Sequence, residues 1–112
     1  MAELLKATFY LPVFTRDNLD AEFHISQLVD AILDSIGGCT ELGFVRGRWR
    51  TPAGRLKIDT HRAFSVLLDR AALPDLVSAI DRFRRAIGET EIYLDVGAVE
   101  NLSVADPPEQ SS

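Results

Sequence analysis

Residues 39–69, CTELGFVRGRWRTPAGRLKIDTHRAFSVLLD, decide the fold of this chain. Two stretches within them, 39–50 and 55–69, have the pattern of long strands. Between these stretches, RTPAGR places Pro52 and Gly54 where a type I turn or a bulged hairpin loop requires them. The segment therefore predicts one long β-hairpin.

A strand and a helix are expected before this hairpin. Residues 5–13, LKATFYLPV, alternate between two faces, which is the period of a strand with one buried side. Pro12 has no N–H to donate, so pairing should end near it. Apolar residues then recur at helical spacing from Ile25 to Ile36, and Gly37-Gly38 follows as a helix stop.

After the hairpin the same order repeats. Pro74 suits the first helical position, an apolar stripe runs to Ile87, and Gly88 ends the helix. Residues 90–99, TEIYLDVGAV, alternate again and predict a final strand whose inward side chains are Ile92, Leu94 and Val96.

The element order is strand, helix, strand, strand, helix, strand. Two right-handed crossovers around a central hairpin predict an α+β, ferredoxin-like sandwich (βαββαβ), with a four-stranded antiparallel sheet and two helices on one face. A chain of 112 residues fits a single domain, assigned to residues 1–102. Residues 103–112 lack apolar anchors and are expected to form a disordered tail.

The composition of the chain restricts the cellular compartment and the classes of partner that we expect. Cys39 is the single cysteine, so no intramolecular disulfide can form and a reducing compartment is the simpler expectation. The N-terminus carries Glu3 where a signal peptide has cations, and no apolar run approaches the ~20 residues of a membrane span. We therefore expect a cytoplasmic protein without membrane contact. A net charge of −5 argues against nucleic-acid binding by the whole surface.

The sheet face away from the helices, the open face, needs an explanation. Its expected occupants are more apolar than a solvent face usually is, and they are Thr8, Tyr10, Ser65, Leu67 and Tyr93, with Trp49 added if the register allows. The face could contact a second subunit, line a small-molecule pocket, or be ordinary surface. A dimer is favoured, because association of two sheets removes most of the patch at once.

Residues 43–57, GFVRGRWRTPAGRLK, concentrate five cations and the single tryptophan. Twelve strand residues span ~40 Å, whereas a helix of about 17 residues covers only ~25 Å. The basic hairpin, residues 46–57, should therefore project past the helices. By alternation the arginines at 46, 48 and 50 share one face with Leu42 and Phe44. Either a bulge at Gly43 or Gly47 resets this register, or the arginines begin where the helical cover ends.

Three uses of the basic hairpin stay open. Its binding candidates are Trp49, Arg46, Arg48, Arg50 and Arg55. They could grip a small anionic ligand, a nucleic-acid backbone or an acidic protein partner, and the preferred version is a neighbouring subunit's carboxylates. Alternatively the hairpin is solvated, and its cations pair with the acidic helices.

Catalytic candidates are few. Asp59 and His61 are two residues apart on one strand face, and a carboxylate beside an imidazole raises its basicity and fixes its tautomer. Tyr10 and Tyr93 are a second candidate pair, in a pocket between sheet and helices. One cysteine and two separated histidines form no zinc set, and there is no G-x-G-x-x-G or Walker A pattern, so no metal and no cofactor are expected.

The runs TFYLPV, GGCTELGFVRGRWR, THRAFSVLL and EIYLDV resemble a group of small uncharacterised bacterial and phage-borne proteins of unknown function. In that group a Gly-Gly-x-Thr step leads to a Gly-x-Trp on a hairpin. The resemblance implies a ferredoxin-like fold and brings no activity. More distantly the layout is similar to dimeric ferredoxin-like barrels, including cofactor-free monooxygenases and ligand-sensing domains, at the level of fold only.

These observations favour a non-enzymatic, homo-oligomeric binding or accessory module, with dimer as the preferred state. Its functional surface would be the open face together with the basic hairpin. One alternative is a small dimeric-barrel enzyme that uses His61 with Asp59, or Tyr10 with Tyr93. The other is a nucleic-acid-associated accessory factor that uses the hairpin arginines and Lys57.

Overall fold

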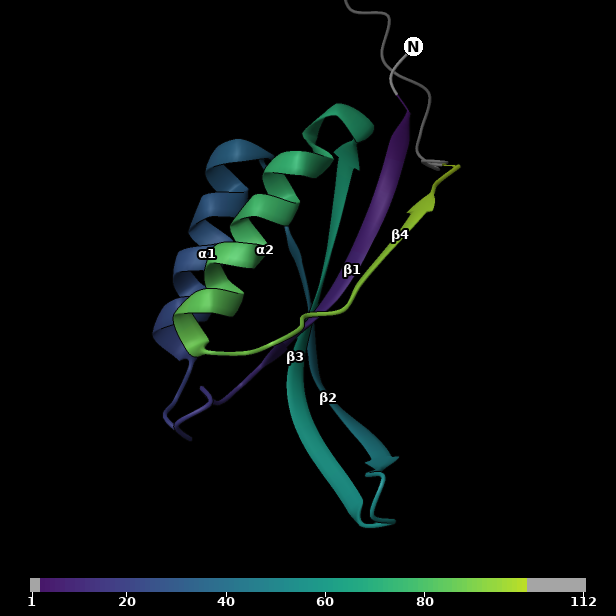
Figure 1. The fold of residues 1–112 in the computed structure, drawn as a ribbon. Coiled ribbons are helices and arrows are strands. Elements are labelled where there is room, and N and C mark those ends of the chain that lie inside the picture. The colour runs from purple at the N-terminus through teal and green to yellow at the C-terminus, as the bar shows by residue number, and fades with distance from the viewer. Residues whose placement is uncertain (1–2, 101–112) are drawn as a thin grey trace, which may run out of the picture.

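A computed structural model gives the structure of residues 3–100 and confirms the predicted α+β architecture. Four antiparallel strands form one sheet in the order β2-β3-β1-β4, and both helices lie on the same side of it (Figure 1). The strands are β1 (Leu4–Pro12), β2 (Thr40–Arg50), β3 (Leu56–Asp69) and β4 (Leu94–Ala98), and the helices are α1 (Glu22–Ser35) and α2 (Leu73–Ile87). The tail expected at 103–112 lies outside the described residues, and the single domain at 1–102 stays a prediction.

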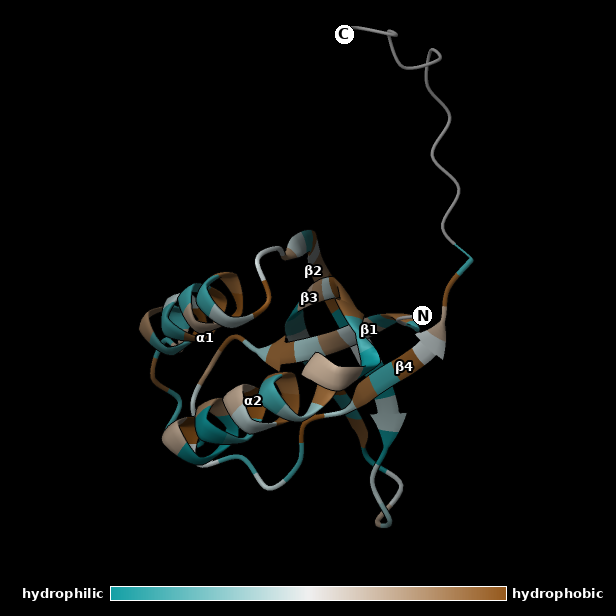
Figure 2. Ribbon diagram, turned by 90° about the horizontal axis from the view of Figure 1, so that it is seen from above, coloured by the Kyte–Doolittle hydropathy of each residue, from teal (hydrophilic) through white to brown (hydrophobic). Residues whose placement is uncertain are grey.

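The core lies between the sheet and the helices, which form separate layers in Figure 2. Every second residue of β1 is fully buried, as the alternation predicted: Leu5, Ala7, Phe9 and Leu11. Phe9 stands opposite Phe64 of β3, with ring centroids 5.8 Å apart, so the two central strands are joined by a stacked aromatic pair. The helices cover this pair with the buried residues Ile25, Leu28, Ile32, Leu76, Ala79, Ile80, Phe83 and Ile87.

Both helices end where the sequence predicts. Ser35 closes α1 just before Gly37-Gly38, and Gly88 caps α2 in the left-handed conformation, with φ +77°. Each helix also carries an apolar residue that does not pack in the core, since Leu33 of α1 and Val77 of α2 are both about half exposed.

The last strand is shorter than predicted. β4 begins at Leu94, not at residue 90, because β1 pairs with it only up to Phe9. Residues 89–93 form the connection from the end of α2 to the sheet edge. Val96 stands opposite Ala7 on the helix side, as expected, but it lies on the edge strand and is 41% exposed, so it does not belong to the core.

The β2–β3 hairpin extends well past both helices (Figure 1), which confirms the projection of the basic hairpin. β1 pairs with β3 only as far as Pro12, which stands opposite His61. Beyond that pair, β3 has β2 as its single neighbour, so the distal part of the hairpin is a two-stranded ribbon. The ribbon closes at Thr51, whose carbonyl accepts a hydrogen bond from the Gly54 N–H at 2.8 Å.

A β-bulge near the start of β2 decides which side chains face which way. The register with β3 shifts between Glu41 and Gly43, and Gly43 has φ +96°, a conformation that few other residues adopt. Beyond the bulge, Phe44 faces the helix side opposite Arg62, yet it is 71% exposed. The two explanations offered from the sequence for the position of the arginines therefore both apply. A bulge at Gly43 resets the register, and the helices stop covering the sheet before the arginines begin.

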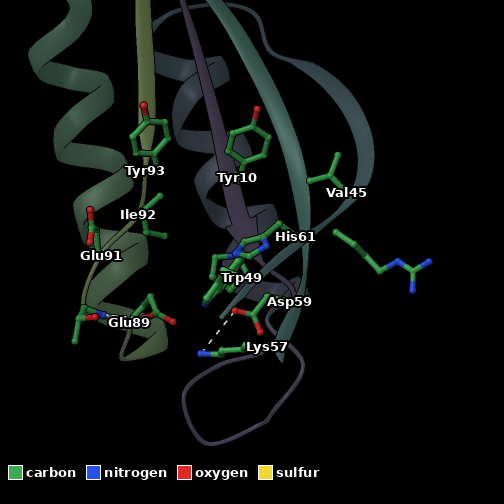
Figure 3. Close-up of a pocket in the computed structure, with 14 residues that line it drawn as sticks. Tyr10, Val45, Trp49, Lys57, Asp59, His61, Glu89, Glu91, Ile92 and Tyr93 are labelled. Carbon is green, nitrogen blue, oxygen red and sulfur yellow. Dashed lines mark hydrogen bonds and ion pairs between the residues drawn. The ribbon is translucent and has the colours of Figure 1, made fainter. Parts of the chain in front are cut away.

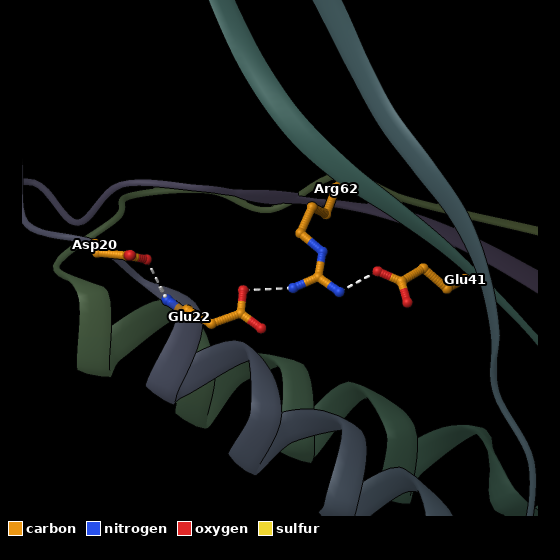
Figure 4. Close-up of polar contacts among 4 residues, drawn as sticks. All are labelled: Asp20, Glu22, Glu41 and Arg62. Carbon is orange, nitrogen blue, oxygen red and sulfur yellow. Dashed lines mark hydrogen bonds and ion pairs between the residues drawn. The ribbon is translucent and has the colours of Figure 1, made fainter.

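Arg62 joins three elements at the point where the hairpin leaves the core (Figure 4). Its guanidinium donates hydrogen bonds to Glu22 of α1 and to Glu41 of β2. The Phe44 and Phe64 rings lie beside it, with centroids 5.8 and 5.4 Å from the guanidinium carbon. The hydrogen bond to Glu41 raises the pKa of Arg62 above its ordinary value, so the charge is fixed at any physiological pH. No local pattern in the sequence marks this cluster, because Glu22 and Glu41 lie 40 and 21 residues away from Arg62.

Replacing Arg62 with methionine should lower the free energy of unfolding by about 1–3 kcal/mol, because two charge-assisted hydrogen bonds and the aromatic contacts are lost while the apolar stem is kept. Urea unfolding followed by circular dichroism measures this. Arg70→Met is the matched control, since Arg70 also pairs with a glutamate, Glu3, but at the exposed surface, where such pairs stabilise little. Equal losses in the two variants would contradict the role given to Arg62.

Candidate functional site

A groove of about 710 Å³ lies on the open face, between the base of the hairpin and the connection at 89–93 (Figure 3). The end of β1 also contributes to it, through Tyr10 and Pro12. We call this the open-face groove. A pocket between the sheet and the helices was expected for the tyrosine pair; this expectation is wrong, because that space is filled by the core and the groove opens on the opposite side of the sheet.

The open-face groove collects most of the candidate residues. Five of them line it together, although they come from β1, β2, β3 and the connection before β4: Tyr10, Trp49, Asp59, His61 and Tyr93. Arg46 also borders the groove, but the register places its side chain on the helix side, opposite Thr60. The remaining arginines at 48, 50 and 55 do not line it.

The bulge settles the position of Trp49, which the sequence left open. Trp49 stands opposite Lys57 and faces the groove, where the indole packs against its own strand. A Cβ added to Gly47 would lie 2.6 Å from the indole Cζ3, so a larger residue at this position would force the ring to move. The Lys57 ammonium is 5.9 Å from the centroid of the indole, within the range of a cation–π contact.

His61 and Asp59 share one face, as predicted, but no hydrogen bond joins them in residues 3–100. Asp59 instead lies 3.8 Å from the Lys57 ammonium. His61 is half-buried in the wall of the groove. Because the carboxylate is paired elsewhere, it does not orient the imidazole in the way that a catalytic pair requires.

The charged surroundings of Tyr93 shift its pKa. The charge of Asp95 raises the pKa of Tyr93, and the hydrogen bond from the phenol to Asp95 Oδ1, at 3.3 Å, acts in the same direction. The side chain is 61% exposed, and Figure 3 shows it beside the groove with Tyr10.

Two carboxylates of the groove were missed. Glu89 and Glu91 lie on the wall opposite the hairpin (Figure 3); Glu91 was expected in the final strand and Glu89 just before it. Only the placement of the connection beside Tyr10 brings them to the site, and no local pattern in the sequence marks that placement.

The rest of the open face matches the prediction in part. Leu67 is half exposed and Thr8 is partly exposed. Ser65 was expected to be exposed but is only 7% exposed, because it stands in the middle of the sheet between Thr8 on β1 and Thr40 on β2. The aromatic part of this face is therefore concentrated at the groove.

The four arginines of the basic hairpin pair with no carboxylate of the described residues. Within residues 3–100 the arginines at 46, 48, 50 and 55 form no ion pair, and all four are exposed. Arg50 donates only to the carbonyl of Gly54, at 3.2 Å. In the described part of the chain these cations do not pair with the acidic helices.

Three other features bear on function. Across residues 3–100, neither helix has both the length and the apolar character that crossing a membrane requires. In the same range no three His, Cys, Asp or Glu side chains are grouped so that they could hold a metal ion. Burial, and then the charge of Glu41, raises the pKa of the free Cys39 thiol, so the thiol is a poor nucleophile at neutral pH.

Replacing Gly47 with alanine should displace the Trp49 indole, because the new methyl group would overlap the ring. We expect a red shift of tryptophan emission and stronger quenching by acrylamide. Gly97→Ala is the control, since nothing lies within 4 Å of the position that its new methyl group would take. Unchanged emission in Gly47→Ala would show that the indole does not pack there.

Asp95→Asn should lower the pKa of Tyr93, because the negative charge that opposes phenolate formation is removed. The titration can be followed by tyrosinate absorbance in a Tyr10→Phe background, where Tyr93 is the single tyrosine. Asp30→Asn, on the far helix, should leave it unchanged. A Tyr93 pKa that stays constant or rises in Asp95→Asn would contradict this.

Solved structures share this fold at low sequence identity. A NIF3-related protein from Bacillus cereus aligns with TM-score 0.65 and 15% identity over 89% of this chain, which spans only 26% of that protein. The divalent ion tolerance protein CutA1 from Ehrlichia chaffeensis gives 0.62 and 8%, covering 92% and 87% of the two chains. A DUF3240 family protein from Shewanella baltica gives 0.58 and 11%, covering 94% and 99%. No family model and no curated protein matches the sequence. These similarities establish the ferredoxin-like fold and nothing beyond it.

Proposed function

We propose that this protein is a non-enzymatic, homo-oligomeric binding or accessory module, in which the basic hairpin (residues 46–57) contacts a second copy of the chain. One observation carries the proposal: the distal hairpin is a two-stranded ribbon that neither helix covers. Isolated two-stranded ribbons are marginally stable in water, so the ribbon gains most from a partner that covers it.

Apolar side chains on the helix side of the ribbon support this. Leu56 and Ile58 are 58% and 47% exposed there, on the same face as Arg48 and Arg50. A partner that covered this face would remove apolar surface from water, at roughly 25 cal/mol for each Å².

The distribution of charge supports a second copy as the partner. Residues 43–57 contribute +5 to a net charge of −5, so the rest of the chain carries −10. Two copies can therefore bring the basic hairpin of one against the acidic surface of the other. Such complementarity guides association and selects the orientation of the two partners.

The free edge of β2 adds a third reason. β2 is an edge strand of 11 residues, and its outer N–H and C=O groups have no strand neighbour in the described residues. Exposed edges of this length invite pairing with another chain. The cations of the hairpin limit uncontrolled pairing, which favours one defined assembly over aggregation.

Finer assignments belong to the same proposal. We prefer a dimer and a cytoplasmic location, and membership of the bacterial and phage group with the Gly-Gly-x-Thr and Gly-x-Trp steps. The packing of the indole over Gly47 gives a physical reason for the second step. An acidic protein or a small anionic ligand would bind the same unpaired arginines of the basic hairpin.

Sedimentation velocity tests the assembly. The wild-type chain, 12.4 kDa, should sediment as an oligomer at micromolar concentration, and added salt should weaken the association. Arg48→Glu combined with Arg50→Glu should give monomers, because both substitutions put negative charge on the ribbon.

Arg16→Glu combined with Arg82→Glu makes the same change in net charge outside the hairpin and should leave the oligomer intact. A monomeric wild-type protein would refute the proposed assembly. If the hairpin variant instead stays oligomeric and loses salt-sensitive retention of nucleic acid, the nucleic-acid-associated function replaces it.

A further inference from the structure

We propose that the open-face groove binds an organic cation, a ligand with an ammonium group on an aromatic or apolar body. This goes beyond the assembly proposed above, because the groove uses the sheet face opposite to the hairpin arginines at 46, 48 and 50. The inference rests on three properties of the groove: its aromatic walls, its surplus of carboxylates, and its size.

The aromatic walls come from three elements. Tyr10 lies at the end of β1, Trp49 lies on the hairpin, and Tyr93 lies on the connection to β4 (Figure 3). Aromatic faces attract ammonium groups through the ring quadrupole, and sets of such faces recognise alkylated ammonium ligands. Ile92 and Val45 add apolar surface for the body of a ligand.

Lys57 shows that one end of the groove already suits an ammonium group. Its Nζ atom lies 3.8 Å from a carboxylate oxygen of Asp59 and 5.9 Å from the centroid of the Trp49 ring. The protein thus holds its own ammonium between an indole and a carboxylate. The other end offers the two tyrosines and Glu91, while Glu89 lies lower on the same wall, level with Asp59 (Figure 3).

The charged residues that border the groove favour a cationic ligand over an anionic one. Asp59, Glu89 and Glu91 border the groove, against Lys57 as the cation whose side chain faces it. Lys57 pairs with Asp59, whereas the Glu89 carboxylate accepts the neighbouring backbone N–H of Thr90, at 3.1 Å. The Glu89 carbonyl accepts a hydrogen bond from the Arg84 guanidinium, also at 3.1 Å, but Arg84 does not line the groove. Neither Glu89 nor Glu91 has an ion-pair partner in residues 3–100. The groove therefore attracts cations and opposes anions.

The size of the groove sets the class of ligand. A volume of about 710 Å³ lies within the range of roughly 300–1,000 Å³ that small-molecule sites occupy. A metal ion or a lone ammonium ion would leave the aromatic walls without contacts. A ring joined by a short alkyl chain to an ammonium group uses both the walls and the carboxylates.

Trp49 is the single tryptophan, so its fluorescence reports directly on the groove. The probe is phenethylamine, and 3-phenylpropionate is its anionic counterpart, with the ring and a similar chain retained. Phenethylamine should cause a saturable change in Trp49 emission, and phenylpropionate should bind at least about tenfold more weakly. Glu89→Gln combined with Glu91→Gln should weaken phenethylamine binding by about tenfold.

Asp30→Asn combined with Asp34→Asn removes the same charge from exposed positions on α1 and should leave binding unchanged. Circular dichroism of each variant checks that it is folded. Equal or tighter binding of phenylpropionate, no saturable response to phenethylamine, or unchanged affinity in the glutamine variant would each overturn the inference.

The Arg48→Glu, Arg50→Glu variant separates this inference from the assembly. It should bind phenethylamine like the wild type, because neither arginine lines the groove. A monomeric wild-type protein that binds the probe would refute the assembly alone. An oligomeric wild-type protein that does not respond would refute the groove alone.

Discussion

The structure depends on the unequal lengths of its central strands. β1 ends at Pro12, opposite His61, while β3 continues for five more residues with β2 as its partner. Beyond that pair the sheet has two strands, and neither helix reaches far enough to cover them. The proximal part of the molecule is a packed sandwich, and the distal part is a ribbon with two exposed faces. The open-face groove lies at this transition, with the last residues of β1 at one side.

Much of the fold followed from local patterns. The alternation in residues 5–13 gave the buried face of β1 residue by residue, and glycines marked both helix ends. The comparison of strand and helix lengths predicted the projecting hairpin. These features could be predicted because each depends on near neighbours in the chain: a period of two, a helical stripe, or a turn of four residues.

The groove could be predicted only in part. His61, Asp59 and the two tyrosines were chosen as separate pairs, and the structure places them together with Trp49. Glu91 was expected in the final strand and Glu89 just before it, and their position depends on how far β1 pairs with β4, which is a property of the whole sheet. The cluster around Arg62 was missed for the same reason, because its partners are 21 and 40 residues away. Contacts between distant segments leave no local period in a sequence.

Leu42, the extra residue of the bulge, has an effect far larger than its size. The bulge takes Leu42 out of the pairing, so Gly43 stands opposite Ala63, the indole faces the groove and the arginines face the other way. If the same residues paired with β3 without a bulge, the groove would be cationic and the opposite face aromatic. Deletion of Leu42 would instead remove the bulge and leave every later side chain of β2 on its present face. The chemistry of the two faces therefore depends on whether this extra residue is looped out of the ladder or paired within it.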